Sequence, residues 1–158
     1  MYPRVRPPRK RIRLGAASYG YPGNPCSVTV VTRHRRPVFA DPAVASGAVR
    51  ILRERSTSTG VPVYAFCVMP DHAHLVVSAS PSCGIVAFVG QYKNLVQREA
   101  WAHGVEGRLW QESFWDHFLR ADEGLDGAVE YVLANPVRAG LARTWREYPF
   151  AGSLAWSL

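Results

Sequence analysis

Two histidines, spaced two positions apart, are the residues of this sequence that point most directly to chemistry. His72 and His74 lie in the segment from Met69 to Val77, where a run of strand-forming residues begins. In a strand, residues i and i+2 point to the same face, so both imidazoles can reach one metal ion. A neutral imidazole is a common metal ligand. The alternative is a surface His-x-His pair without a metal, because two ligands alone make a weak site.

A second segment, from Glu130 to Gly140, contains oxygen atoms that can complete such a site. On a helix, Tyr131 and Asn135 are four residues apart and lie on one face. The Asn135 side-chain oxygen can then join the two imidazoles, with the Tyr131 phenol one turn away. Two nitrogens and one oxygen suit Mg²⁺ or Mn²⁺ and leave positions for a substrate oxygen. The apolar residues next to Tyr131 fit a core helix equally well.

Three blocks of sequence together carry a family resemblance. They run from Met69 to Val77, from Phe114 to Arg120 and from Tyr131 to Gly140. In this order they resemble the REP-associated tyrosine transposases, which belong to the single-tyrosine, HUH (His-hydrophobic-His) class. The resemblance extends from about Arg9 to Phe150. The order of the blocks makes it more specific than any one block.

The resemblance implies a reaction and a role for each site residue. His72, His74 and Asn135 would hold Mg²⁺ or Mn²⁺, and Tyr131 would attack a phosphate of single-stranded DNA. The products would be a free 3′-hydroxyl and a 5′-phosphotyrosine link that is later rejoined. The substrate would be single-stranded DNA beside hairpins of palindromic repeats. Relatives include monomers and homodimers. Asp71 is expected to form the turn or to support the ligands.

The positive charge of the chain is concentrated at its N-terminus. The formal net charge is +7, and Met1 to Arg13 holds six basic residues and no acidic one. These six residues are Arg4, Arg6, Arg9, Lys10, Arg11 and Arg13. Prolines exclude a helix here, so residues 1–14 are predicted to be a basic arm that binds DNA phosphates. A solvated tail is the alternative. Arg120 and Arg138 are further candidate phosphate contacts.

Composition is consistent with a single domain over residues 15–158, which the resemblance implies is HUH transposase-like. A chain of 158 residues with 47% hydrophobic content can form a single core. No apolar stretch approaches the roughly 18 residues that a membrane span needs, so no membrane partner is expected. Cys26, Cys67 and Cys83 are an odd number with wide spacing. Reduced thiols in a cytoplasm are therefore expected.

Residue patterns predict the elements that must position the site. Gly15–Pro25 is expected to be an irregular loop, and Asp41 is expected to cap the first helix. Pro136 should bend or end the last helix near Asn135. The predicted elements are strands over 26–33, 61–68 and 72–78, helices over 42–55 and 85–101, an irregular strand from 108–110 and 114–119, and a helix from residue 122 or 123 onward that bears Tyr131.

This order predicts an α+β, ferredoxin-like fold. It has an antiparallel sheet with helices on one face and an additional C-terminal helix that carries Tyr131. Two other functions stay open. A catalytically silent module that binds DNA or RNA hairpins would not need the histidines, Asn135 and Tyr131, whereas a metallohydrolase that uses water would leave Tyr131 and the arm without a role. Tyr92, a rival nucleophile, lies on an apolar stripe and is expected to be a core aromatic.

Overall fold

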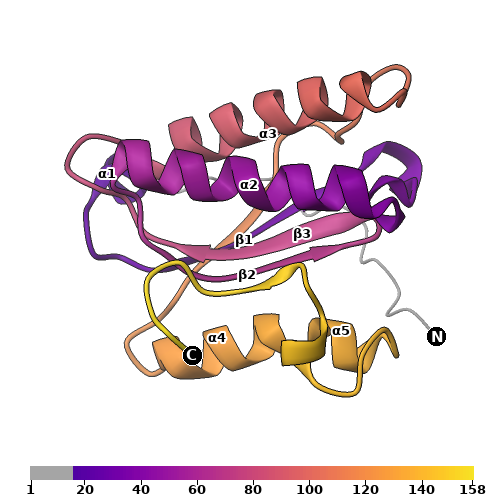
Figure 1. The fold of residues 1–158 in the computed structure, drawn as a ribbon. Coiled ribbons are helices and arrows are strands. Elements are labelled where there is room, and N and C mark those ends of the chain that lie inside the picture. Colours follow the sequence, from indigo (N-terminus) through magenta and orange to yellow (C-terminus); the bar gives the residue numbers. More distant parts are fainter. Residues whose placement is uncertain (1–15) are drawn as a thin grey trace.

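A five-stranded antiparallel sheet lies between two layers of helices. The computed structural model describes residues 16–158 (Figure 1). The strand order is β4-β1-β3-β2-β5, and every pair is antiparallel. The strands are β1 (Cys26–Val31), β2 (Val63–Met69), β3 (His72–Val77), β4 (Trp115–Phe118) and β5 (Ala151–Gly152). The predicted α+β class is confirmed, and the short strand β5 was not predicted.

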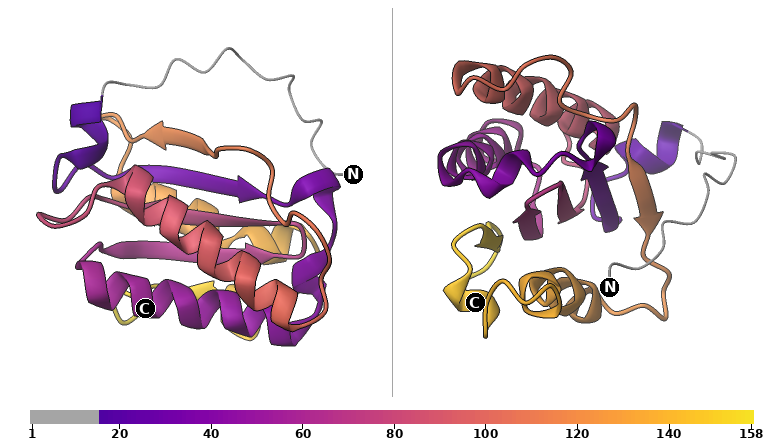
Figure 2. Two further views of the ribbon diagram at one scale, coloured as in Figure 1. Left: turned by 90° about the horizontal axis from the view of Figure 1, so that it is seen from above. Right: turned by 90° about the vertical axis from the view of Figure 1, so that its right-hand side faces the viewer.

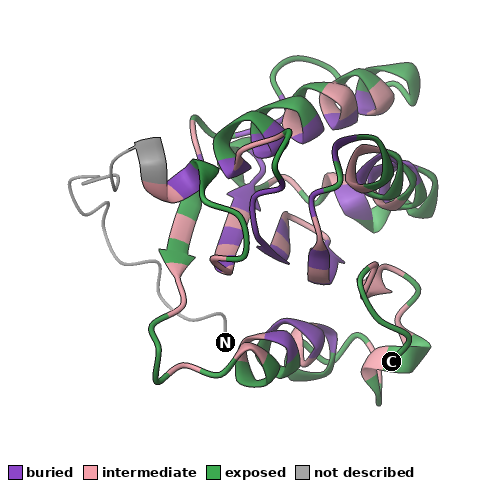
Figure 3. Cartoon of the chain, turned by 90° about the vertical axis from the view of Figure 1, so that its left-hand side faces the viewer, coloured by how far each residue is buried: buried purple, intermediate pink, exposed green. Residues whose placement is uncertain are grey.

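The helices are divided between the two faces of the sheet. They are α1 (Ala16–Gly20), α2 (Pro42–Thr59), α3 (Ile85–Ala102), α4 (Leu125–Leu133) and α5 (Asn135–Arg138). Figures 1 and 2 show α2 and α3 on one face and α4 and α5 on the other. Buried residues gather in the strands and on the sides of the helices that face the sheet (Figure 3). The sheet therefore supports a separate apolar cluster on each face.

The central strand β3 contributes to both clusters by alternation. Ala73, Leu75 and Val77 lie in the large core beneath α2 and α3, whereas Val76 packs with residues of α4. Because side chains alternate along a strand, His72 and His74 lie on the same face as Val76. The histidine pair is thus on the α4 side of the sheet, beneath the last helices as the sequence predicts.

Helix α2 begins as predicted and ends later. The Asp41 side chain accepts a hydrogen bond from the backbone N–H of Ala43 at 2.9 Å. The helix was expected to end at Arg55, but it continues to Thr59. The reason is local, because the Thr59 hydroxyl donates to the Arg55 carbonyl oxygen at 2.6 Å. Gly60 then ends the helix with a left-handed φ of 71°.

Two further predictions about elements were wrong. The expected irregular loop over Gly15–Pro25 contains the short helix α1. Tyr19 anchors this helix, since its hydroxyl donates to Asp116 of β4 at 2.5 Å. The fourth strand is also shorter than expected. Only Trp115–Phe118 pairs as a strand, and Trp110 forms an isolated bridge with Thr32, because the chain turns between them at Ser113, whose φ is 60°.

The remaining boundaries shift by a few residues. Strand β1 ends at Val31 rather than at residue 33, and β2 covers Val63–Met69 rather than 61–68. Strand β3 stops one residue early, and α3 runs one residue longer than predicted. Helix α4 begins at Leu125 and ends at Leu133, followed directly by α5. The predicted interruption near Asn135 is confirmed. No described helix is long and apolar enough to cross a membrane.

Tyr92 is fully buried in the core between α3 and the sheet, as predicted for a core aromatic. Among the described residues, its hydroxyl has no hydrogen-bond partner. Burial also raises the pKa of this phenol above its ordinary value. A buried hydroxyl without a partner costs free energy because it has lost its water.

We therefore expect Tyr92→Phe to raise the free energy of unfolding by about 1 kcal/mol. Urea unfolding followed by circular dichroism measures the change. Tyr148→Phe is the matched control, because the Tyr148 hydroxyl donates to the Val68 carbonyl oxygen at 2.7 Å. That variant is expected to lose about 1 kcal/mol. A loss of stability in Tyr92→Phe would show that its hydroxyl is satisfied in solution.

Candidate active site

The two histidine side chains face each other at the beginning of β3. The Nε2 atoms of His72 and His74 are 3.1 Å apart, and the rings meet edge to face. Strand pairing fixes their neighbours. His74 lies between Thr29 of β1 and Cys67 of β2, and His72 pairs with Met69 across the hairpin. Since β3 is the middle strand, the backbone of both histidines is paired with β1 on one side and with β2 on the other.

The opposite nitrogen of each ring has its own hydrogen-bond partner. His72 Nδ1 lies 2.6 Å from Asp71 Oδ1, and His74 Nδ1 lies 2.8 Å from the Thr29 hydroxyl. An ionised carboxylate only accepts, so His72 donates through Nδ1 and its Nε2 carries the lone pair while the ring is neutral. When His74 also donates through Nδ1, the two Nε2 lone pairs point at one position. A shared cation would stabilise that arrangement.

Asp71 is in turn held by Thr32 and Arg35, which follow β1. Its Oδ2 accepts from Arg35 at 3.2 Å. Its backbone oxygen accepts from the N–H of Thr32 at 3.0 Å and from the Thr32 hydroxyl at 2.9 Å. Burial opposes ionisation of Asp71, but the hydrogen bond from His72 and the Arg35 guanidinium outweigh it, so its pKa is lowered. The carboxylate is therefore charged where His72 needs an acceptor.

The turn that carries Arg35 has an unusual backbone. His34 and Arg35 have φ values of 57° and 50°. A left-handed conformation at a residue other than glycine costs about 1–3 kcal/mol. Contacts on both sides hold the turn, since Arg33 N–H donates to the Leu109 carbonyl oxygen and Arg36 donates to that of Arg108. The turn presents Arg35 to Asp71.

Tyr131, Asn135 and Arg138 form a second group at the junction of α4 and α5. Arg138 donates to the Tyr131 carbonyl oxygen at 3.0 Å and to Asn135 Oδ1 at 3.1 Å. Its guanidinium carbon lies 4.2 Å from the centre of the Tyr131 ring. The Tyr131 side chain is 62% exposed. The predicted one-face relation of Tyr131 and Asn135 is thus present and is bridged by Arg138.

The two groups lie on the same side of the sheet but do not touch through the tyrosine. Among the described residues, no hydrogen bond or ring contact joins Tyr131 to His72 or His74. They are connected through the apolar cluster that packs Val129, Val132 and Leu133 of α4 on β2 and β3. Arg138 provides an electrostatic link, because its charge helps to lower the pKa of His74.

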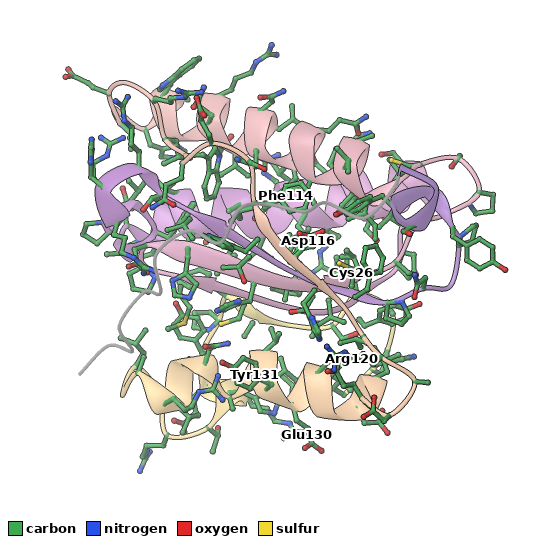
Figure 4. All side chains as sticks on the ribbon, turned by 180° about the vertical axis from the view of Figure 1, so that it is seen from behind. Cys26, Phe114, Asp116, Arg120, Glu130 and Tyr131 are labelled. Carbon is green, nitrogen blue, oxygen red and sulfur yellow. The ribbon has the colours of Figure 1, made fainter. Side chains whose placement is uncertain are left out.

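The other predicted DNA-binding residues are not part of either group. Arg120 is exposed before the start of α4, and Figure 4 shows Tyr131 further along that helix. The backbone N–H of Arg120 donates to the Glu123 carboxylate at 3.1 Å. The six basic residues from Arg4 to Arg13 lie outside the described residues, as does the whole predicted arm of residues 1–14.

The sequence interpretation overlooked Thr29 and the specific role of Arg35. The signal for Thr29 was present, because Ser27 and Thr29 alternate with Val28 and Val30 in β1. This alternation places the polar residues on the α4 side. No local pattern could have paired Arg35 with Asp71, which is 36 residues away.

The histidine-bearing part of the chain matches a known family. The model of the family described as "Transposase IS200 like" matches residues 26–122, from β1 to the segment before α4. The chain belongs to this family. The match includes both histidines, Asp71 and Thr29, and it ends before Tyr131 and Asn135.

Individual relatives of this IS200-like transposase chain agree with the assignment. The REP-associated tyrosine transposase of Escherichia coli K12 is 26% identical over 89 residues, which is 56% of this chain and 52% of that protein. The ISDra2 transposase TnpA of Deinococcus radiodurans is 35% identical over 75 residues, or 46% of this chain and 54% of that protein. The chain spans about half the length of the curated relatives it matches.

The fold also matches that of a solved structure. A REP-associated tyrosine transposase bound to a REP hairpin superposes with a TM-score of 0.68. The match covers 84% of this chain and 78% of that chain, at 22% identity. At this identity the likeness shows that the two chains share a fold.

The donor set suits a divalent cation with open positions. Two imidazole nitrogens face each other, and each ring is oriented through its other nitrogen. Among the described residues, no three His, Cys, Asp or Glu side chains gather as a complete metal cluster. Further ligands would therefore be an amide oxygen, such as Asn135 Oδ1, or oxygens of water or substrate.

His74 remains neutral over the usual pH range. Burial lowers its pKa to about 3, and the neighbouring His72 and Arg138 act in the same direction. In the unfolded chain, a histidine takes up a proton near its ordinary pKa of about 6.5. The unfolded state therefore binds the extra proton first, and folding stability is lost as the pH falls below about 6.5.

We expect His74→Gln to lose less stability than the parent between pH 7 and pH 5. The difference is about 2 kcal/mol, because between these pH values the imidazole takes up a proton only in the unfolded chain. Urea unfolding at both pH values, with a chelator to remove metal, measures it. His34→Asn is the control, because it removes an exposed imidazole at a positive φ that asparagine accepts. Equal losses in parent and His74→Gln would contradict a neutral, buried His74.

Proposed function

We propose that this chain is a metal-dependent single-stranded DNA transesterase. It would cleave and rejoin DNA beside palindromic hairpins through a 5′-phosphotyrosine intermediate. The observation that supports this most is the histidine pair, whose Nε2 atoms converge while Asp71 and Thr29 hold the other nitrogens. A chain that only binds DNA has no need for this arrangement. Membership in the IS200-like family agrees with it.

In this proposal, His72, His74 and the Asn135 oxygen hold Mg²⁺ or Mn²⁺. When bound, the cation would polarise the scissile phosphate and offset its charge. Each imidazole binds as a neutral ligand. Because the pKa of His74 is about 3, its ring is already neutral near neutral pH and need not be deprotonated before it binds a metal. His72 keeps its orientation through the charged Asp71. The two imidazole ligands are thus oriented before DNA arrives.

Tyr131 is the proposed nucleophile. The phenol would give up its proton to solvent as its oxygen forms a bond to phosphorus. The bond from phosphorus to the 3′ oxygen would break, and the 3′ oxygen would take up a proton from solvent. The reverse steps, with a different 3′-hydroxyl, would rejoin the DNA. The 62% exposure of the Tyr131 side chain leaves it open to a strand that approaches along α4. Helix α4 must bring this phenol to a phosphate that lies against the histidines.

The proposed substrate follows from the relatives and from charge. A curated relative is named a REP-associated tyrosine transposase, which suggests single strands beside hairpins of palindromic repeats. The basic arm of residues 1–14 carries six of the positive charges and would bind phosphates without regard to sequence. Residues 15–158 would form the single catalytic domain. Arg120 and Arg138 would add contacts near α4.

We expect Tyr131→Phe to abolish cleavage and the covalent adduct, by roughly 10³-fold or more, because only the nucleophilic oxygen is lost. A labelled single-stranded hairpin from repeats flanking the gene is incubated with Mn²⁺ and protein, and run on a denaturing gel. Hairpin binding should stay within about twofold. Tyr21→Phe is the control, since Tyr21 is also exposed, at 70%. Cleavage by Tyr131→Phe would assign the nucleophile elsewhere, and binding without cleavage by the parent would favour the hairpin-binding module.

Asp71 allows a separate test of the metal site. We expect Asp71→Asn to weaken Mn²⁺ binding about 10- to 100-fold, because His72 loses the charged acceptor that orients its ring. Isothermal titration calorimetry without DNA measures the affinity. Asp126→Asn, at an exposed position in the first turn of α4, is the control. Unchanged affinity in Asp71→Asn would mean that β3 alone positions His72.

A further inference from the structure

The break between α4 and α5 leaves backbone carbonyl groups that need partners. Pro136 has no N–H, so the carbonyl oxygen of Val132 lacks the usual donor four residues later. Asn135 supplies one, because its Nδ2 donates to the Val132 oxygen at 3.0 Å. Arg138 donates to the Tyr131 oxygen at 3.0 Å. The orientation of the Asn135 amide is therefore set by the end of the helix, with its oxygen pointing away from it.

That oxygen is already occupied. Arg138 donates to Asn135 Oδ1 at 3.1 Å, so the atom proposed as a metal ligand has a positive guanidinium next to it. A divalent cation at the same oxygen would be repelled by this charge. Arg138 also covers the Tyr131 ring at 4.2 Å. One side chain thus holds both the proposed nucleophile and the proposed third ligand.

The charge of Arg138 is not balanced by a described acidic residue. No ion pair joins it to a carboxylate among residues 16–158, whereas Arg35, Arg50, Arg108 and Arg143 each have such a pair. Arg138 is also exposed to solvent. A phosphate group placed between the histidines and α5 would complement it, because a guanidinium fits phosphate oxygens well.

We propose that Arg138 is a positioning residue that holds Asn135 Oδ1 in the DNA-free protein and exchanges it for a DNA phosphate. The third metal ligand would then become free only when substrate is bound. The inference rests on the proposed function. It makes the metal site depend on DNA, so that the free protein binds the cation weakly and the complex binds it tightly. A helix cap without this role would have no effect on metal affinity.

The test measures Mn²⁺ affinity by calorimetry in the Tyr131→Phe background, which keeps the ring and prevents cleavage. Without DNA, Arg138→Gln is expected to raise the affinity at least fivefold, because the charge beside Asn135 is removed. Adding a single-stranded hairpin should then raise the Mn²⁺ affinity of the Arg138→Gln protein by a smaller factor than it raises the affinity of the Tyr131→Phe protein. Arg138→Lys keeps the charge on a side chain without the planar fork and should show less of the DNA-free gain.

Two controls test whether the gain in Mn²⁺ affinity depends on the Asn135 oxygen. Arg143→Gln removes a positive charge five residues later and should leave DNA-free Mn²⁺ affinity unchanged. Adding Asn135→Ala to Arg138→Gln should cancel the gain, because the released oxygen is gone. An unchanged or lower affinity in folded Arg138→Gln, with thermal unfolding as the check, would overturn the proposal. Failure of the proposed function would look different, because the parent would then show no Mn²⁺ binding that depends on His72.

Discussion

The position of β3 in the middle of the sheet is the constraint on which the candidate site depends. Both edges of this strand are paired, and both faces are covered, so each side chain must suit one of two layers. Ala73, Leu75 and Val77 belong to the core under α2 and α3. The opposite face becomes less apolar toward the start of the strand, from Val76 to His74 and His72. The histidines thus sit where the cover by α4 gives way to polar groups.

The candidate site is built from two layers that are held in place by different contacts. The histidine layer is fixed by backbone pairing and by two hydrogen bonds, since Thr29 of β1 holds the His74 ring and Asp71 of the β2–β3 turn holds the His72 ring. The tyrosine layer is one short helix that ends at Leu133, three residues before Pro136, and packs through a small apolar cluster. In the proposed reaction, the tyrosine layer would bring Tyr131 to a phosphate that lies at the histidine layer.

Local chemistry explains which parts of this structure could be predicted. The hairpin, the α3 stripe and the interruption at Asn135 follow from period, turn residues and Pro136, and all are present. The predicted end of α2 was wrong, and α1 was not predicted, because Thr59 and Tyr19 make contacts that helix propensity does not describe. The Arg35 to Asp71 pair joins residues far apart in the chain, which no window of sequence can show. The roles of Tyr131 and Asn135 stay predictions, since the family match ends before them.

The residues that stabilise the α4 to α5 junction are also the ones to which we assign a role in chemistry, and this would let substrate control the site. Pro136 removes a donor, and Asn135 and Arg138 supply replacements to the Val132 and Tyr131 carbonyls. The arrangement that ends the helix correctly also turns the Asn135 oxygen toward a guanidinium. A phosphate offers that guanidinium a better partner than a neutral amide, because the hydrogen bonds become charge-assisted. The energy that would free the ligand therefore comes from DNA binding and not from unfolding of the helix end.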